Sequence, residues 1–214
     1  MTETLHSNGA VRHFGEPLAT ARGAVVLLHG RGGSAEDILQ LGQAMYIPGI
    51  AYLAPQAANH TWYPYSFLAQ RQQNEPWLSS ALDKVKSTVQ TALDAGLPAE
   101  KIVIGGFSQG ACLSTEFVAA NPQRYGGLIA FTGGLIGPED SELTHGGDLG
   151  GMPAFFGTGD PDPHVPWTRV QESAKILEGM GARTTVRRYE LRPHTITREE
   201  LEFGKRLLEE AFAK

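Results

Sequence analysis

The sequence predicts an α/β fold, with a mainly parallel twisted sheet and helices on both of its faces. Short apolar, β-branched runs alternate with longer stretches of helical spacing, and this alternation is typical of parallel strands joined by crossover helices. Most of the short runs are continuously apolar, as expected for strands that are covered on both sides. Because a chain of 214 residues with 41% apolar residues can bury one core, we expect a single domain over residues 1–214.

The individual elements follow from these runs and from local end signals. Strands are expected at Ala24–Leu28, Ile50–Leu53, Ile102–Gly105, Gly127–Phe131, Pro153–Gly157 and Thr184–Tyr189. A further run, Val11–Phe14, is a candidate antiparallel edge strand. Helices are expected at Ser34–Gln43, Pro76–Ala95, Gln109–Ala120, Trp167–Gly179 and Thr197–Phe212. Two of these helices carry a capping signal, since Asp37 follows Ser34 and Glu200 follows Thr197 at a spacing of three.

Two long segments, Pro55–Glu75 and Gly133–Gly151, interrupt the alternation. Long irregular segments inside a compact domain are usually functional or mobile. The first is rich in aromatic side chains, namely Trp62, Tyr63, Tyr65 and Phe67. We therefore expect both segments to face the substrate, with Trp62, Tyr63 and Phe67 as candidate substrate-binding residues.

Composition and charge exclude several classes of function. The formal net charge is −5, and Lys and Arg are too scattered to follow a nucleic-acid backbone. The one cysteine, Cys112, rules out an internal disulfide and a cysteine-based zinc cluster, which fits a reducing, cytoplasmic setting. The start of the sequence lacks the basic and apolar regions of a secretory signal. No apolar run approaches the roughly 20 residues that span a bilayer, so we expect no membrane span.

A nucleophile motif stands at Gly106–Gly110, which reads Gly-Phe-Ser-Gln-Gly and matches G-x-S-x-G. A β-branched run precedes it and a helical pattern follows it, as this strand-to-helix turn requires. The two glycines have a mechanical reason, because the turn strains the serine and brings neighbouring backbones too close for a β-carbon. Ser108 is therefore the candidate nucleophile; the alternative is an ordinary glycine-rich turn.

A serine nucleophile needs a base, and the base needs a carboxylate to orient it. With this type of turn the order along the chain is serine, acid, histidine. His194 lies between the last predicted strand and the last predicted helix, where a loop would deliver an imidazole over Ser108, and it is the favoured base. Five of the other six histidines are interpreted as ordinary surface or structural residues: His6, His13, His60, His145 and His164.

Two carboxylates compete for the role of the acid. Asp160 and Asp162 both follow the strand predicted at Pro153–Gly157, so their position does not separate them. Asp160 has the features of a turn former whose side chain caps local backbone amides.

A second glycine-rich turn follows the first buried strand. Gly30-x-Gly32-x-x-Ala35 formally fits a dinucleotide-binding fingerprint. Such a site also requires an acidic residue about 20 positions later, at the end of the second strand. The sequence has no acidic residue between Asp37 and Glu75, which argues against a dinucleotide site.

The same turn is better explained as an oxyanion loop, in which backbone N–H groups face the negative charge of a tetrahedral intermediate. The expected donors are the amides of Arg31 and Gln109. His29 would then hold the loop rather than act as a base, and Cys112, one helical turn after Ser108, is expected to be simply buried.

With these residues placed, the chain resembles the phospholipase/carboxylesterase family of α/β hydrolases, which includes acyl-protein thioesterases and small bacterial carboxylesterases. The likeness covers nearly the whole chain and rests on Leu27–Gly33, Ala54–Gln56 with Trp62-Tyr63, Gly106–Ala111, Gly159–Pro166 and the His194 loop. It implies an α/β-hydrolase fold without a large cap domain. In the family the acid lies three residues before a Val-Pro pair, which implies Asp162, and the oxyanion donors match Arg31 and Gln109.

The chain departs from the family pattern at two places. Thr158-Gly159 stands where a His-Gly is usual, and Trp62-Tyr63-Pro64 stands where Trp-Phe-Asp is common. Both departures leave the three predicted catalytic residues in place. They bear on the substrate, because the Trp62 loop borders the family's acyl pocket, and a protein-thioesterase role is not implied.

The expected protein is a serine carboxylesterase that hydrolyses small to medium acyl esters through an acyl-serine intermediate, without a metal or organic cofactor. Its expected partner is a small-molecule ester, and the resemblance makes a homodimer a candidate assembly. A thioesterase or lysophospholipase is the alternative within hydrolases, since these share the acyl-enzyme step. A non-catalytic small-molecule receptor on the same fold is the alternative from another class.

Overall fold

The structure is a computed structural model that describes residues 5–139, 141 and 143–213. Its seven-stranded sheet has the order β1-β3-β2-β4-β5-β6-β7. The strands are β1 (Val11–Gly15), β2 (Ala24–Leu28), β3 (Ala51–Pro55), β4 (Ile102–Phe107), β5 (Gly127–Phe131), β6 (Pro153–Asp160) and β7 (Arg183–Glu190). β1 runs antiparallel to β3 and the other neighbours are parallel. The predicted α/β class is therefore confirmed, including the antiparallel edge strand.

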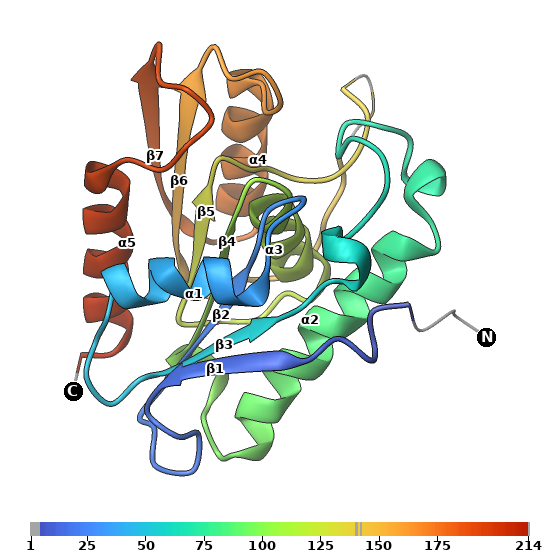
Figure 1. The fold of residues 1–214 in the computed structure, drawn as a ribbon. Coiled ribbons are helices and arrows are strands. Elements are labelled where there is room, and N and C mark those ends of the chain that lie inside the picture. The colour runs from blue at the N-terminus through green and yellow to red at the C-terminus, as the bar shows by residue number, and fades with distance from the viewer. Residues whose placement is uncertain (1–4, 140, 142, 214) are drawn as a thin grey trace.

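Helices cover both faces of this sheet (Figure 1). The α-helices are α1 (Ala35–Ala44), α2 (Trp77–Asp94), α3 (Gln109–Ala120), α4 (Trp167–Gly179) and α5 (Arg198–Ala211), and short 3₁₀ turns occur at Ala58–His60, Arg71–Asn74 and Ala99–Lys101. α1 and α5 share one apolar cluster with the sheet, whereas α2, α3 and α4 share the other. The sheet thus separates two cores.

Strand β2 shows why the central strands are apolar throughout. All five of its residues are buried. Val26 and Leu28 belong to the core under α2, α3 and α4, while Val25 and Leu27 belong to the core under α1 and α5. Successive side chains of a strand point to opposite faces, so both sets must be apolar when both faces are covered.

The predicted helix starts have the expected chemistry. The Ser34 side chain accepts a hydrogen bond from the amide of Asp37, and the Asp37 carboxylate accepts one from the amide of Ser34. Thr197 and Glu200 form the same reciprocal pair at the start of α5. These bonds satisfy amides that a helix start leaves free.

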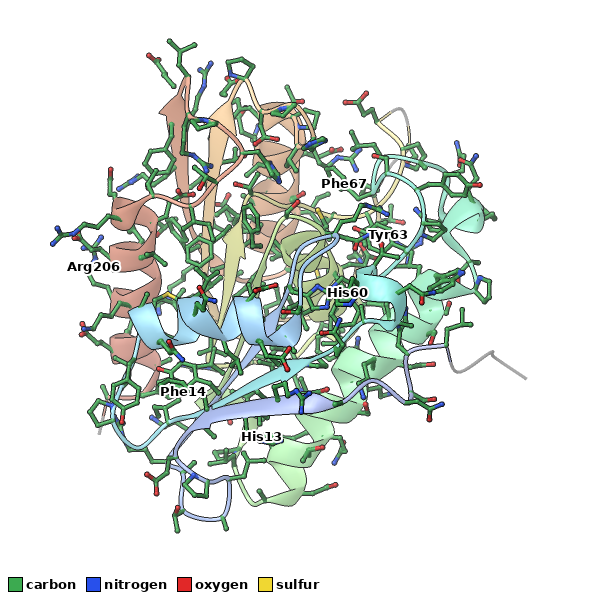
Figure 2. All side chains as sticks on the ribbon, in the orientation of Figure 1. His13, Phe14, His60, Tyr63, Phe67 and Arg206 are labelled. Carbon is green, nitrogen blue, oxygen red and sulfur yellow. The ribbon has the colours of Figure 1, made fainter. Side chains whose placement is uncertain are left out.

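Several strands extend beyond their predicted ends. β6 and β7 stay paired up to Asp160 and Glu190, because backbone pairing continues where the side chains have stopped being apolar. The parallel strands all end at one edge of the sheet, so the loops that follow them meet there. Figure 2 shows His60, Tyr63 and Phe67 along the loop between β3 and α2, on that side of the molecule. In the part of the chain that the structure describes, no helix is both long and apolar enough to cross a membrane.

Candidate active site

Ser108 stands between the end of β4 and the start of α3. Its backbone has φ 54° and ψ −119°, a conformation that costs energy for a residue with a side chain and that persists only where the surroundings impose it. Its amide donates to the carbonyl of Phe131 on the neighbouring strand (3.0 Å), and its carbonyl accepts from the amide of Cys112 (3.0 Å). The strand and the helix thereby fix the strained turn.

The two glycines of the turn are required by close backbone contacts. A β-carbon at Gly106 would lie 2.6 Å from the carbonyl oxygen of Leu28, and one at Gly110 would lie 2.0 Å from the same atom. Neither distance is sterically possible. The spacing of glycines around Ser108 therefore has the mechanical origin expected from the sequence.

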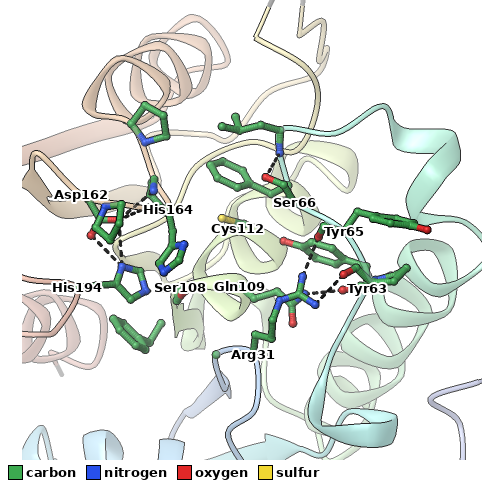
Figure 3. A pocket seen from close by; sticks show the side chains of 18 of the residues that line it. Arg31, Tyr63, Tyr65, Ser66, Ser108, Gln109, Cys112, Asp162, His164 and His194 are labelled. Carbon is green, nitrogen blue, oxygen red and sulfur yellow. Dashed lines mark hydrogen bonds and ion pairs between the residues drawn. The ribbon is translucent and has the colours of Figure 1, made fainter.

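His194 lies between Ser108 and Asp162 (Figure 3). Its Nε2 is 2.8 Å from the Ser108 hydroxyl, and its Nδ1 is 2.8 Å from Asp162 Oδ2. Since an ionised carboxylate only accepts hydrogen bonds, Nδ1 carries the ring proton and Nε2 is free to accept the serine proton. The side chain of Asp162 is fully buried, whereas that of His194 is 20% exposed.

Asp162 is fixed from two directions. Its Oδ1 also accepts the amides of His164 and Val165, both at 2.9 Å. Burial alone would raise the pKa of this carboxyl, but the bonds from His164, His194 and Val165 outweigh it and hold the pKa below its ordinary value. Asp162 is therefore ionised at neutral pH.

Asp160 occupies a different environment two residues earlier. Its carboxylate pairs with the guanidinium of Arg188 on β7, not with His194. The local amides that Asp160 was expected to cap are bound by Asp162 instead. Of the two carboxylates left open by the sequence, the structure brings only Asp162 against the histidine.

Ring contacts around His194 were not foreseen from the sequence. Phe107 lies 5.1 Å from it between ring centroids, and His164 meets it edge-on at 5.0 Å. Phe107 is the variable residue before the serine, and only the fold shows that its ring reaches the histidine. Both rings limit the orientations that the imidazole can adopt.

A buried polar cluster supports the loop that carries His194. Arg192 donates to the Thr132 hydroxyl at 3.0 Å and lies 3.4 Å from Glu200 Oε1. Arg192 is 7% exposed and Glu200 is fully buried. Burial raises the pKa of Glu200 despite the opposing effects of Thr197 and Arg192. The cluster joins the end of β5 to the His194 loop and to α5. No motif in the sequence predicts it.

The two predicted oxyanion donors lie at free positions of the backbone. Gln109 is the first residue of α3, so its amide has no partner within the helix and lies at the positive end of the helix dipole. The amide of Arg31 makes no backbone hydrogen bond within the described residues. Neither amide therefore has a hydrogen-bond partner in the described part of the chain, as an oxyanion donor requires.

His29 supports the glycine-rich turn of residues 30–33, which is the predicted oxyanion loop and is called the oxyanion turn below. It is 1% exposed, and its Nε2 accepts the amide of Ala57 (3.1 Å) while Nδ1 lies 2.8 Å from the carbonyl of Gly30. Burial lowers the pKa of His29, which keeps the ring neutral. These contacts fit the structural role expected from the sequence.

A pocket of about 860 Å³ opens over these groups. Its lining includes the three predicted catalytic residues, both predicted oxyanion residues, and Tyr63, Phe67 and Cys112 (Figure 3). Cys112 is buried, and burial raises the pKa of its thiol to about 12. It is therefore not a nucleophile at neutral pH. Within the described residues, no group of three or more His, Cys, Asp or Glu side chains could hold a metal ion.

Trp62 differs from its expected place at the substrate surface. It is fully buried and does not line the pocket. Its indole N–H donates to the carbonyl of His29 at 2.9 Å, and its ring lies 5.0 Å from the His29 ring. A tryptophan gains from burying its large ring once its N–H has an acceptor, so Trp62 supports the oxyanion turn, while Tyr63 and Phe67 face the pocket.

Comparisons with known proteins show which family the chain belongs to. A family profile described as Phospholipase/Carboxylesterase matches residues 15–211. The crystal structure of a phospholipase/carboxylesterase from Dyadobacter fermentans is similar with a TM-score of 0.90 and 48% identity, over 94% of this chain and 96% of that one. The Bacillus cereus carboxylesterase shares the fold, with a TM-score of 0.72 and 21% identity, over 98% of this chain and 99% of that one.

Curated relatives include several acyl-protein thioesterases. The Kluyveromyces lactis acyl-protein thioesterase 1 is 32% identical over 102 residues, which are 47% of this chain and 45% of that protein. The Saccharomyces cerevisiae enzyme of the same name is 37% identical over 87 residues, 41% of this chain and 38% of that protein. The matched stretches thus span less than half of these two relatives. The profile match and the similarity to the Dyadobacter structure show that the chain belongs to the phospholipase/carboxylesterase family of carboxylic ester hydrolases.

Proposed function

We propose that this chain hydrolyses carboxylic esters with small to medium acyl groups through an acyl-serine intermediate. Ser108 is the nucleophile, His194 the general base and Asp162 the acid that orients it. The observation that carries the proposal is the unbroken chain of contacts from the Ser108 hydroxyl through His194 to Asp162, with 2.8 Å at each step.

In the first half of the reaction, Ser108 Oγ attacks the ester carbonyl carbon and His194 Nε2 takes the hydroxyl proton. The carbonyl oxygen becomes negatively charged and accepts hydrogen bonds from the amides of Arg31 and Gln109. When the tetrahedral intermediate collapses, the bond to the alcohol oxygen breaks and His194 returns the proton to it. The alcohol leaves and the acyl group remains on Ser108.

In the second half, a water molecule replaces the alcohol. His194 takes one proton of the water as its oxygen attacks the acyl carbon, and the same amides stabilise the charge. Collapse releases the carboxylic acid and restores the Ser108 hydroxyl with the proton from His194. Asp162 stays ionised throughout and stabilises the imidazolium formed in each half, and the lowered pKa of Asp162 supports this role.

The size of the pocket fits an organic acyl group of limited length. Its volume of about 860 Å³ is in the usual range for small-molecule sites. Tyr63 and Phe67 give it an aromatic wall. We propose that these two side chains contact the acyl group. We also propose that residues 1–214 work as a single domain.

Turnover measurements on aryl esters of increasing acyl length test the proposal. We expect hydrolysis that peaks at short to medium chains and disappears in Ser108→Ala, while the melting temperature of that variant stays near the parental value. A Ser108→Ala protein that keeps even a tenth of parental kcat/KM would contradict the nucleophile assignment.

A thioesterase is the second candidate, favoured by the relatives named acyl-protein thioesterase 1. Ester and thioester substrates with the same acyl group distinguish the two, because only the leaving atom changes. A kcat/KM more than about tenfold higher for the thioester would assign the chain to thioester hydrolysis, since a tenfold ratio is about 1.4 kcal/mol of barrier.

A further inference from the structure

The side chain of Arg31 reaches from the oxyanion turn to the loop that follows β3. Its Nη1 donates to the Thr61 hydroxyl (3.0 Å) and to the carbonyl of Pro64 (2.9 Å), and its Nη2 donates to the carbonyl of Tyr65 (2.7 Å). Figure 3 shows the guanidinium lying against this segment at the wall of the pocket. One side chain therefore fastens the turn to three points of Thr61–Tyr65.

Gln109 fastens its own side chain to the same segment. Its Oε1 accepts the amide of Trp62 (2.9 Å), and its Nε2 donates to the carbonyl of Tyr63 (2.8 Å). Arg31 lies in the turn between β2 and α1, whereas Gln109 is the first residue of α3, and their amides are the two proposed oxyanion donors. The segment Thr61–Tyr65 is thus the common support of both donor residues.

The turn needs such a support because three of its residues, Gly30, Gly32 and Gly33, are glycines. Gly32 has φ +77°, and a β-carbon added there would meet nothing within 4 Å. Glycine leaves the backbone free to adopt many conformations. Beside the guanidinium bonds, two contacts with His60 tie the turn to this loop: the amide of Gly32 donates to the carbonyl of His60 at 2.7 Å, and His60 Nδ1 lies 2.8 Å from the carbonyl of Gly33.

We propose, resting on the proposed function, that the Arg31 guanidinium is a positioning residue for ester hydrolysis. It holds the turn against Thr61–Tyr65 so that the amides of Arg31 and Gln109 converge on one oxygen. Oxyanion donors act only when they are already placed at about 2.7–3.1 Å from the position of that oxygen. The guanidinium thus acts through the backbone and does not touch the reacting atoms.

Arg31→Met tests the proposal, since it keeps the backbone N–H and most of the aliphatic stem but removes the three bonds to the loop. We expect kcat and kcat/KM for an aryl ester to fall together by roughly 10- to 100-fold, because a donor misplaced by about 1 Å costs up to that much. KM should stay within about threefold of the parental value, as expected when ground-state binding is untouched. The affinity for a boronic acid, which mimics the tetrahedral intermediate at Ser108, should fall by the same factor as kcat.

Two further variants provide an intermediate case and a control. Arg31→Lys keeps the charge but presents a single ammonium group to three dispersed acceptors, so its kcat should lie between those of the parent and Arg31→Met. Arg198→Met is the matched control, because Arg198 is 93% exposed and pairs only with Glu202 on the surface of α5 among the described residues. It should have parental kcat and KM.

The outcomes separate this inference from the function on which it rests. If the parent is active and Arg31→Met has the same kcat, the inference is overturned and the proposed function is not. The same holds if KM rises while kcat is unchanged, since Arg31 would then bind the substrate directly. If Arg31→Met does not fold, Arg31→Lys carries the test by the same criteria. A parent that hydrolyses no ester and is not labelled at Ser108 by a phosphonate overturns the proposed function, and the inference with it.

Discussion

Replacing Asp162 by asparagine changes one atom of the buried carboxylate and tests the role of the acid. The amides of His164 and Val165 still need an acceptor after this change, since both donate to Asp162 Oδ1 at 2.9 Å. The oxygen of the new asparagine side chain can take that place. Its NH₂ group then faces His194 Nδ1, where Asp162 Oδ2 lies at 2.8 Å in the parent.

This exchange reverses the tautomer of the histidine. An NH₂ group only donates, so Nδ1 must accept, and the ring proton moves to Nε2. Nε2 lies 2.8 Å from the Ser108 hydroxyl and can then no longer accept its proton. In a comparable serine protease triad the same substitution lowers kcat roughly 10⁴-fold, which corresponds to about 5 kcal/mol of barrier. We expect a loss of that order for Asp162→Asn, with the substrate still bound.

Asp160→Asn is the matched control, because it makes the same chemical change two residues away. Asp160 pairs with Arg188, whose side chain is 50% exposed, and such partly exposed pairs contribute about 0–1 kcal/mol to stability. Asp160→Asn should keep nearly parental kcat. Steady-state hydrolysis of an aryl ester and thermal melts on both variants make the comparison; an inactive Asp160→Asn beside an active Asp162→Asn would refute the assignment.

Two further predictions concern stability. Arg192→Met should lower the free energy of unfolding in urea by about 3 kcal/mol or more, because it leaves the buried Glu200 carboxylate without its cation. The control Arg188→Met should lower it by less than about 1 kcal/mol. Equal losses would show that the buried Arg192–Glu200 pair does not stabilise the fold. The pKa of Asp162 is lowered by folding, so its contribution to stability is complete above the ordinary carboxyl pKa and is lost as the pH falls through the folded value. Denaturant midpoints from about pH 6 down to about pH 3 should therefore fall less steeply in Asp162→Asn than in the parent, and identical slopes would show that the carboxylate gains nothing on folding.

The fold was predictable because its signals are local. Central strands such as Ile102–Phe107 are covered on both faces and read as continuous apolar runs, and the helix starts at Ser34 and Thr197 carry their caps in the sequence. The class and the family were both confirmed. The ends of β6 and β7 were missed because their backbone pairing continues beyond the last apolar residues.

Local sequence motifs also predicted the three candidate catalytic residues, whereas they did not predict the side chains that support them. Ser108 sits in a motif whose glycines are explained by contacts with Leu28, and its role remains a prediction, as do those of His194 and Asp162. The supports of the site were not predictable, because they join residues distant along the chain: Arg192 with Thr132 and Glu200, and Arg31 with the loop after β3. The burial of Trp62 was also hidden, since a tryptophan in a long loop has the same sequence pattern whether it faces the substrate or the core.

The central claim is that Ser108 carries the acyl group during turnover. Incubating the protein with an activated aryl ester, quenching in acid and digesting it for mass spectrometry should show one added acyl mass, on the peptide that contains Ser108. Ser108→Ala should show none and should release no aryl alcohol above the buffer rate. Acylation of a different residue, or turnover by Ser108→Ala, would contradict the account.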